Sequence, residues 1–243
     1  MVATQERVGL GVGERPSERL RELAAPVWDQ ILAHPYLKEL KAGTLPVDTF
    51  RFYVQQDWLY LQEFTRAGAI IAGRIPDARG LKFMLTWVEP LVGMEYHFHR
   101  AHATELGLDF DHINWEMNEA NWAYSRHMLA AAHGSSPAEG LAAMLPCPHV
   151  YSHVGAVLRD GPLPPNPMYA EWIEFYAPGK LSSVDERTYD RDARIVGLTN
   201  QFDELAAGLD AAAWARCERN YLISSRYEWW FWDTAYRKQT WPV

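Results

Sequence analysis

Apolar residues recur at steps of three and four positions along most of this chain, which is the spacing of one buried face of an α-helix. The first such run begins at Ser17 and ends at His34-Pro35, because the residue before a proline avoids the α region. Its apolar positions are Leu20, Leu23, Ala24, Val27 and Ile31. The second run predicts a long helix from Asp48, a favourable N-cap residue, to about Arg74. Its inward positions include Phe52, Val54, Leu61, Phe64 and Ile71.

Turn and capping residues divide the rest of the chain into further helices. We expect these over residues 78–106, 118–133, 137–158, 168–176, weakly over 187–209, and over 211–237. Pro90 predicts a kink, Gly107 a helix C-terminus, and Ser136-Pro137 a cap followed by a first helical position. No strand-like alternation or repeat interrupts the pattern. The sequence therefore predicts one all-α domain over residues 17–243, preceded by a disordered polar leader over residues 1–16.

Composition narrows the classes of partner. A net charge of −8 argues against nucleic acid and against an anionic membrane surface, because both require a basic patch. Two distant cysteines make no disulfide framework, and no apolar run approaches the length of a membrane span, so we expect a cytoplasmic protein. The 11 Trp and 12 Tyr residues indicate thick helix packing or an aromatic-walled pocket.

One of the two cysteines lies in an unusual stretch, Leu145-Pro146-Cys147-Pro148-His149-Val150-Tyr151. Pro148 suits the first turn of a helix, which would place Cys147 at or next to the N-cap. Free N–H groups and the positive end of the helix dipole favour a thiolate there, and Tyr151 follows on the same face. The alternative is a small buried cysteine that fills a helix start. On this stretch alone, that structural role is the more common one.

An acidic residue interrupts an aromatic face in the long early helix. Tyr53, Asp57, Tyr60 and Phe64 are spaced by four, three and four positions, so they share one side. A carboxylate that faces the interior must be paired or hydrogen-bonded. Asp57 could bind a ligand, through the amino group and ring nitrogen of a heterocycle. It could instead have a structural role, bound to an N–H group or an arginine where two helices meet. The spacing does not distinguish the ligand-binding role from the structural one.

A second carboxylate lies within the aromatic stretch Tyr221–Tyr236. Glu228 is surrounded there by Tyr227, Trp229, Trp230, Phe231 and Trp232. Burial among such residues would raise the pKa of a glutamate toward neutrality, where it could act as a general acid or base. A salt bridge to Arg226 or Arg237 is the alternative, and the apolar surroundings favour the functional interpretation.

Histidines suggest a competing metal site. Glu95, His99 and His102 share one face of an expected helix, a plausible half of a carboxylate-bridged site. The late aromatic helix contains no histidine, so the second half would depend on His149 and His153. Solvent-exposed or structural roles are therefore favoured for these histidines.

Three motifs occur here together, in order and at the spacing found in one family. Residues 52–61 (FYVQQDWLYL), 145–151 (LPCPHVY) and 227–236 (YEWWFWDTAY) strongly resemble the TenA family of thiaminase II, or aminopyrimidine aminohydrolase, proteins. The resemblance extends from about His34 to Arg237. It implies a single-domain, heme-oxygenase-like helical bundle. It also implies hydrolysis of 4-amino-5-aminomethyl-2-methylpyrimidine or thiamin to the hydroxymethyl pyrimidine, for thiamin salvage.

The resemblance also implies roles for individual residues. Cys147 is similar to the nucleophile that adds to the pyrimidine ring, Glu228 to the acid/base, and Asp57 to the carboxylate that binds the 4-amino group and adjacent ring nitrogen. The residues that match ring-lining tyrosines are Tyr60, Tyr124, Tyr151 and Tyr176. The family implies a small-molecule substrate, a homotetramer, and no metal or organic cofactor.

The chain departs from the family pattern over residues 177–200, which look longer and less helical than expected and could form a lid or an oligomer contact. Two other functions compete with the hydrolase. One is a dinuclear-metal oxidase on the same fold that uses Glu95, His99, His102 and His153. The other is a non-catalytic protein that binds a pyrimidine ligand or a partner protein.

Overall fold

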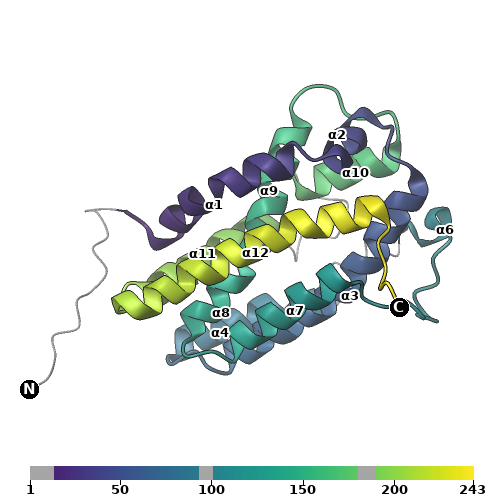
Figure 1. Cartoon of the computed structure of the whole chain (residues 1–243). Coiled ribbons are helices and arrows are strands. Elements are labelled where there is room, and N and C mark those ends of the chain that lie inside the picture. Colours follow the sequence, from purple (N-terminus) through teal and green to yellow (C-terminus); the bar gives the residue numbers. More distant parts are fainter. Residues whose placement is uncertain (1–13, 93–100, 180–189) are drawn as a thin grey trace, which may run out of the picture.

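In a computed structural model, the described residues 14–92, 101–179 and 190–243 form helices and no β-strand, which confirms the all-α prediction (Figure 1). In chain order the elements are α1 (Pro16–Leu32), α2 (Pro35–Ala42), α3 (Val47–Ala72), α4 (Ala78–Val88), the 3-10 helix η1 (Glu89–Val92), α6 (Ala103–Leu106), α7 (Glu119–Ala132), α8 (Pro137–Met144), α9 (Pro146–Arg159), α10 (Pro167–Tyr176), α11 (Arg191–Ala206) and α12 (Ala211–Arg237). The expected leader lies outside the described residues, apart from residues 14–16.

The helix α12 packs against many of the other helices, namely α1, α2, α3, α7, α8 and α9. It contacts α1 on one side, α3 and α7 on another, and α8 and α9 between them (Figure 1). Its aromatic residues explain this position, because Tyr221 and Trp232 are fully buried and Phe231 nearly so. Three helices that carry candidate site residues, namely α3, α7 and α9, therefore face the middle of α12.

Most helix ends follow from local capping. Asn118, Ser136 and Asp210 each accept a hydrogen bond from a backbone N–H in the first turn of α7, α8 and α12. Gly107 ends α6 with φ = 63°, a left-handed conformation that favours glycine. The predictions for Ser136-Pro137, Gly107 and the helix over 211–237 are confirmed.

Three features of the first part of the chain differ from the sequence-based expectations. Pro46 occupies the N-cap position, and Asp48 lies in the first turn, where its carboxylate pairs with Lys238 beyond the end of α12. The turn after His34 also contains a helix that periodicity missed, since α2 is only 8 residues long. His34 caps α2 by accepting a hydrogen bond from the Tyr36 N–H at 3.1 Å, and Pro35 is its first residue. In α1, Leu23 is 42% exposed rather than inward.

The helix expected over residues 78–106 is divided. The helix α4 ends at Val88, and Pro90 lies in η1, so the predicted break at this proline is confirmed. Residues 93–100, which include Glu95 and His99, lie outside the described ranges. The chain is described again from residue 101 and forms the short α6.

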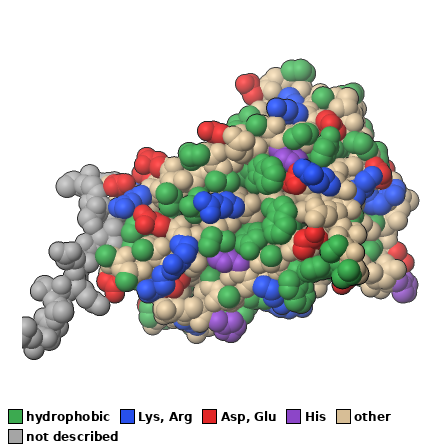
Figure 2. All heavy atoms as spheres, in the orientation of Figure 1, with side chains coloured by type: hydrophobic (Ala, Val, Ile, Leu, Met, Phe, Trp, Pro, Cys, Tyr) green, Lys and Arg blue, Asp and Glu red, His purple; other side chains and the backbone are tan. Residues whose placement is uncertain are grey.

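The surface carries both signs of charge. On the face drawn in Figure 2, lysines and arginines alternate with acidic side chains rather than forming one basic patch. The run Pro137–Arg159, which joins α8 and α9, is long and apolar enough to cross a membrane, contrary to the expectation from sequence. However, 67% of its most apolar window is buried inside the bundle, as in the core helix of a soluble protein.

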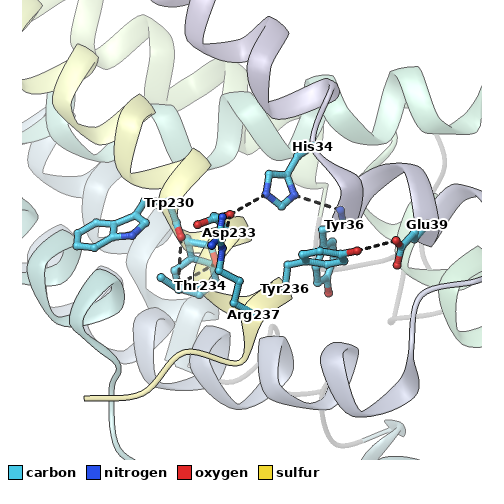
Figure 3. A network of polar contacts seen from close by, with 9 residues as sticks. His34, Tyr36, Glu39, Trp230, Asp233, Thr234, Tyr236 and Arg237 are labelled. Carbon is cyan, nitrogen blue, oxygen red and sulfur yellow. Dashed lines mark hydrogen bonds and ion pairs between the residues drawn. The ribbon is translucent and has the colours of Figure 1, made fainter. Parts of the chain in front are cut away.

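A polar network joins α2 to the last turns of α12 (Figure 3). The His34 ring lies 3.5 Å from Asp233, which also pairs with Arg237 at 3.0 Å. Tyr236 donates a hydrogen bond of 2.7 Å to Glu39 of α2. These contacts fix the C-terminal part of α12, the helix that carries Glu228.

Candidate active site

Cys147 lies where α8 passes into α9. Leu145 has helical dihedrals, ends α8 and precedes α9, so the two helices are almost continuous. Leu145 is the N-cap residue of α9, Pro146 is its first residue and Cys147 its second. Cys147 therefore lies one position further into the helix than the residue next to the N-cap. Because the carbonyl end of α8 abuts the N–H end of α9, the two helix dipoles partly cancel at this point. The helix start is therefore a weaker source of thiolate stabilisation than the sequence suggested.

A cavity of about 550 Å³, counting its open mouth, lies beside this junction. Its walls contain four of the residues that the sequence singled out: Asp57 from α3, Cys147 and Tyr151 from α9, and Tyr176 from α10. The remaining lining residues are Leu61, Phe64, Trp87, Leu91, Pro148, Arg191, Arg194 and Ile195. The cavity is therefore mostly apolar, with a few convergent polar groups, as is typical of sites for small molecules.

The wall formed by Tyr151 and Tyr176 depends on a glycine. The two rings lie 4.6 Å apart between centroids. One turn after Tyr151, Gly155 packs directly on the main chain, where a Cβ atom would lie 2.4 Å from the carbonyl carbon of Tyr176. Only a residue without a side chain permits this approach, which holds the two tyrosines together.

Asp57 is 4% exposed, and aromatic residues surround it at the inner end of the cavity. The hydroxyl of Tyr53 lies 3.3 Å from that of Tyr151 and accepts a hydrogen bond from the Trp172 indole at 3.4 Å. Burial raises the pKa of Tyr53 and Tyr151 well above the ordinary value, and the charge of Asp57 raises both further. Asp57 therefore faces neutral phenols in a region of low dielectric.

Glu228 of α12 is 2% exposed and accepts a hydrogen bond of 2.7 Å from Tyr124. Burial raises the pKa of Glu228 to about 8, the hydrogen bond from Tyr124 lowers it in part, and the charge of Asp57 raises it. The alternative partner Arg237 pairs instead with Asp233. Glu228 thus holds a proton near neutral pH, as a general acid requires.

Tyr60 and Tyr124 are buried close enough to Glu228 and Cys147 to be influenced by both, but they do not line the cavity. Their ring centroids are 5.0 Å apart. Burial is the main reason that the pKa of each is raised, and the charges of Cys147 and Glu228 add to it for both. Both tyrosines therefore sense the cysteine and the glutamate at once. All seven residues predicted for the site are gathered in one region, four on the cavity wall and three buried beside it.

Gln56, next to Asp57 in the sequence, holds α7 in place. Its side chain accepts hydrogen bonds of 3.0 Å from the Asn118 N–H and the Asn121 amide, and donates one of 2.9 Å to the Glu116 carbonyl. These bonds fix the N-terminus of α7, and hence the direction in which Tyr124 faces Glu228.

The histidines near Cys147 face elsewhere. His149 hydrogen-bonds with the Thr199 hydroxyl at 2.8 Å and the Tyr221 hydroxyl at 3.0 Å, and burial lowers its pKa to about 3. With His153 it lines a different cavity, between α1, α9 and α11. A histidine that is neutral and already bonded on both nitrogens does not serve as the base for Cys147.

The residues of the competing metal site are only partly described. His102 pairs with Glu171 at 3.2 Å, and the His153 ring packs against Trp28 at 5.4 Å. Across the described residues, no three histidine, cysteine or acidic side chains are grouped as metal ligands. Glu95 and His99 lie outside those residues.

Two arginines of α11 that the sequence analysis did not select, Arg191 and Arg194, also line the cavity. They fall in the segment 177–200 that departs from the family pattern. Residues 180–189 of that segment lie outside the described ranges, and helix begins at Arg191. Their three-residue spacing places both arginines on one helix face. A charged helix face is usually exposed to solvent, so this spacing did not indicate a site.

A model of the TENA/THI-4/PQQC family matches residues 21–238. The chain belongs to this family. It is 32% identical over 227 residues to the aminopyrimidine aminohydrolase of Bacillus subtilis, across 93% of this chain and 91% of that protein. It is 30% identical over 224 residues to the aminopyrimidine aminohydrolase of Halalkalibacterium halodurans, across 91% and 96%. These relatives confirm the predictions of family and of a hydrolase.

Solved structures agree with this assignment. A TenA homologue from P. horikoshii superimposes with a TM-score of 0.80 at 27% identity, over 93% of this chain and all of that one. A Shewanella denitrificans domain with a heme oxygenase-like fold gives a TM-score of 0.67 at 15% identity over 91% of this chain, which concerns the fold alone. The predicted heme-oxygenase-like bundle is therefore confirmed.

Proposed function

We propose that this protein is an aminopyrimidine aminohydrolase that replaces the leaving group on the exocyclic carbon of a 4-aminopyrimidine with a hydroxyl group. The observation that carries the proposal is the convergence of Asp57, Cys147 and Tyr151 on one aromatic cavity, with Glu228 buried next to it. The family relatives named for this activity support the same reaction.

In this proposal, Asp57 binds the substrate. The ionised form of a carboxylate buried among phenols is stabilised most by hydrogen-bond donors that carry positive charge, such as an amino group and a protonated ring nitrogen. Tyr151 and Tyr176 flank the ring, and Tyr60 and Tyr124 close the inner side. A protonated ring is also more electrophilic, so the group that anchors the substrate prepares it for attack.

Cys147 and Glu228 carry the chemistry in the proposal. The thiolate adds to the ring, and the amine or thiazole leaves the exocyclic carbon with the bonding electrons and, for the amine, a proton from Glu228. Water supplies the hydroxyl group to that carbon, and the sulfur leaves the ring as the thiolate. The proton that the water loses returns to Glu228 after the amine has left, and passes to solvent after the thiazole has left. The pKa of Glu228, about 8, suits a residue that must give up a proton and regain it.

The test is an assay of ammonia release from 4-amino-5-aminomethyl-2-methylpyrimidine, with thiamin as the second substrate. We expect turnover by the wild-type protein and none by Cys147→Ser, with the helical circular dichroism spectrum unchanged. Wild-type turnover in the variant would exclude Cys147 as the nucleophile. Binding of the pyrimidine without turnover by the wild-type protein would support a non-catalytic binder instead.

For the assembly and the compartment we propose a cytoplasmic homotetramer, in keeping with the family. The exposed aromatic and aliphatic side chains Trp122, Val157 and Val196 provide apolar surface that such contacts could cover. Light scattering on the purified protein measures the mass, and a monomer at micromolar concentration would contradict the tetramer.

A further inference from the structure

The outer part of the cavity carries two positive charges. Arg191 and Arg194 are three residues apart in the first turn of α11 and both line the cavity that contains Cys147 and Asp57. Arg191 is partly exposed, whereas Asp57 and Tyr151 at the other end are buried. The cavity thus has an acidic, aromatic inner end and a basic outer end.

Main-chain carbonyl groups and aromatic rings hold both guanidinium groups in place. Arg191 donates a hydrogen bond to the carbonyl oxygen of Tyr176 and lies 5.6 Å from the centre of its ring. Arg194 donates to the carbonyl oxygens of Thr86 and Trp87 and lies 5.6 Å from the Trp87 ring. Carbonyl and ring contacts fix the side chains without neutralising their charge.

Two arginines outside the cavity, Arg79 and Arg15, lie closer to a carboxylate than Arg191 does. Arg79 pairs with Glu204 at 2.6 Å, and Arg15 with Asp203 at 2.7 Å. The acidic partner of Arg191 is Asp192, which is 40% exposed and 3.8 Å away, so solvent screens the attraction. Arg191 therefore retains positive potential on the cavity wall, where the outer portion of a ligand would lie.

We infer that this outer end binds the phosphate of a substrate whose leaving portion is a phosphate ester, such as a phosphorylated thiamin. This inference rests on the proposed function. A planar guanidinium group offers paired donors that match phosphate oxygens, and the N-terminus of α11 adds the positive end of its dipole. The thiazolium cation is repelled by these arginines in thiamin and in its phosphate ester alike, and only the ester adds negative charge that they attract.

The chemistry of the reaction is unchanged. The bond between the exocyclic carbon and the thiazole nitrogen breaks, the nitrogen keeps the electron pair, and water contributes the hydroxyl group to the carbon. The phosphate ester leaves intact on the thiazole. Its only roles are to bind and to orient the leaving portion.

The experiment compares kcat/KM for thiamin monophosphate with kcat/KM for thiamin. We expect the wild-type protein to prefer the phosphate ester by about 10-fold or more, and Arg191→Gln and Arg194→Gln each to reduce that ratio by about 10-fold. Arg194→Lys keeps the charge and should keep most of the preference. The matched control is Arg79→Gln, which removes a positive charge between α4 and α11 outside the cavity and should leave the ratio unchanged.

Calorimetric titration with inorganic pyrophosphate tests the same subsite without catalysis. Binding by the wild-type protein that Arg191→Gln and Arg194→Gln abolish supports the inference, provided that melting temperatures show folded variants. A wild-type protein that neither prefers the phosphate ester nor binds pyrophosphate overturns it. Ammonia release from the aminomethyl pyrimidine would persist in that case, whereas its absence would instead refute the proposed function.

Discussion

The two cysteines of this chain have opposite surroundings. Cys147 is partly exposed, lies between two prolines and lines the same cavity as Asp57. Cys217 is fully buried in the first half of α12, where burial raises the pKa of its thiol to about 12 and the charge of Glu139 adds to the effect. A thiol with that pKa remains protonated and has no route to a substrate.

The difference shows that position, not residue type, gives a cysteine its role. Cys217 fills space among helices, which is the role that base rates assign to a lone cysteine. Cys147 occupies a helix junction that opens onto a cavity, and the buried carboxyl group of Glu228 lies nearby. Replacing each cysteine in turn therefore separates chemistry from packing within one protein.

The largest effect is expected for Cys147→Ser. Removing a nucleophile that forms a covalent intermediate lowers turnover by roughly 10³-fold or more, since a serine hydroxyl is rarely ionised at neutral pH. Cys217→Ser is the matched control. It should keep turnover within about two-fold and lose about 1–2 kcal/mol of stability, because it buries a hydroxyl group.

Steady-state kinetics and thermal melting on both variants make the measurement. Similar losses of turnover in the two variants would mean that the effect comes from the fold. In that case the assignment of Cys147 would fail.

Glu228→Gln tests the acid/base proposed to act beside Cys147. We expect turnover to fall by about 10²–10⁴-fold, the usual contribution of a general acid or base. Because the pKa of Glu228 is about 8, wild-type kcat should decline as the pH rises above that value. Glutamine does not ionise, so the residual activity of the variant should lack this decline.

The same carboxyl predicts a change in stability with pH. The folded pKa of Glu228, about 8, lies above the ordinary value of 4.5, so the native state binds a proton that the unfolded state has lost between these two values. Its contribution is fully present below pH 4.5 and is lost as the pH rises through about 8. As the pH rises from about 5 to about 9, the melting temperature of the wild type should therefore fall relative to that of Glu228→Gln. A constant difference would show that burial does not shift this carboxyl.

Gly155→Ala changes the helix of Cys147 without replacing the proposed nucleophile. The new methyl group would meet the main chain of Tyr176, so the helix or the tyrosine must move. We expect about 1–3 kcal/mol of destabilisation and a rise in KM as the ring-binding wall opens. Gly208→Ala, just before the helix of Cys217, is the control, because open space surrounds that position and stability should hardly change. Equal effects in thermal melting and KM would show that Gly155 has no special contact.

The sequence predicted what local physics determines. The aromatic surroundings of Glu228 forced it into the interior, the helical spacing placed Asp57 and Tyr60 on one buried face, and Ser136-Pro137 marked the start of α8. The motif resemblance then joined segments that are distant in the chain. Those parts of the fold and the site followed from neighbours in the sequence or from a shared pattern.

Other features depend on long-range contacts that no local pattern contains. Gly155 looks like any helical glycine until the main chain of Tyr176 is placed against it. Arg191 and Arg194 resemble a solvent-exposed face, and only the packing of α11 against α4 and α10 turns them toward the cavity. Asp48 was predicted as a cap because its residue type favours that position, but the N-cap of α3 lies two residues earlier, at Pro46, and the Asp48 carboxylate pairs with Lys238 instead.

The smallest effect is expected for Tyr124→Phe, which isolates the partner of Glu228. The hydrogen bond from Tyr124 lowers the pKa of Glu228, so its loss should move the decline of kcat to higher pH, by up to about one pH unit. Turnover at neutral pH should fall by only about 3–10-fold, since Glu228 itself remains. Cys217 is distant from this bond, and Cys217→Ser should leave the pH profile where it is. If Tyr124→Phe also leaves the profile in place, the reactivity around Cys147 does not depend on the tyrosine and burial alone sets the proton affinity of Glu228.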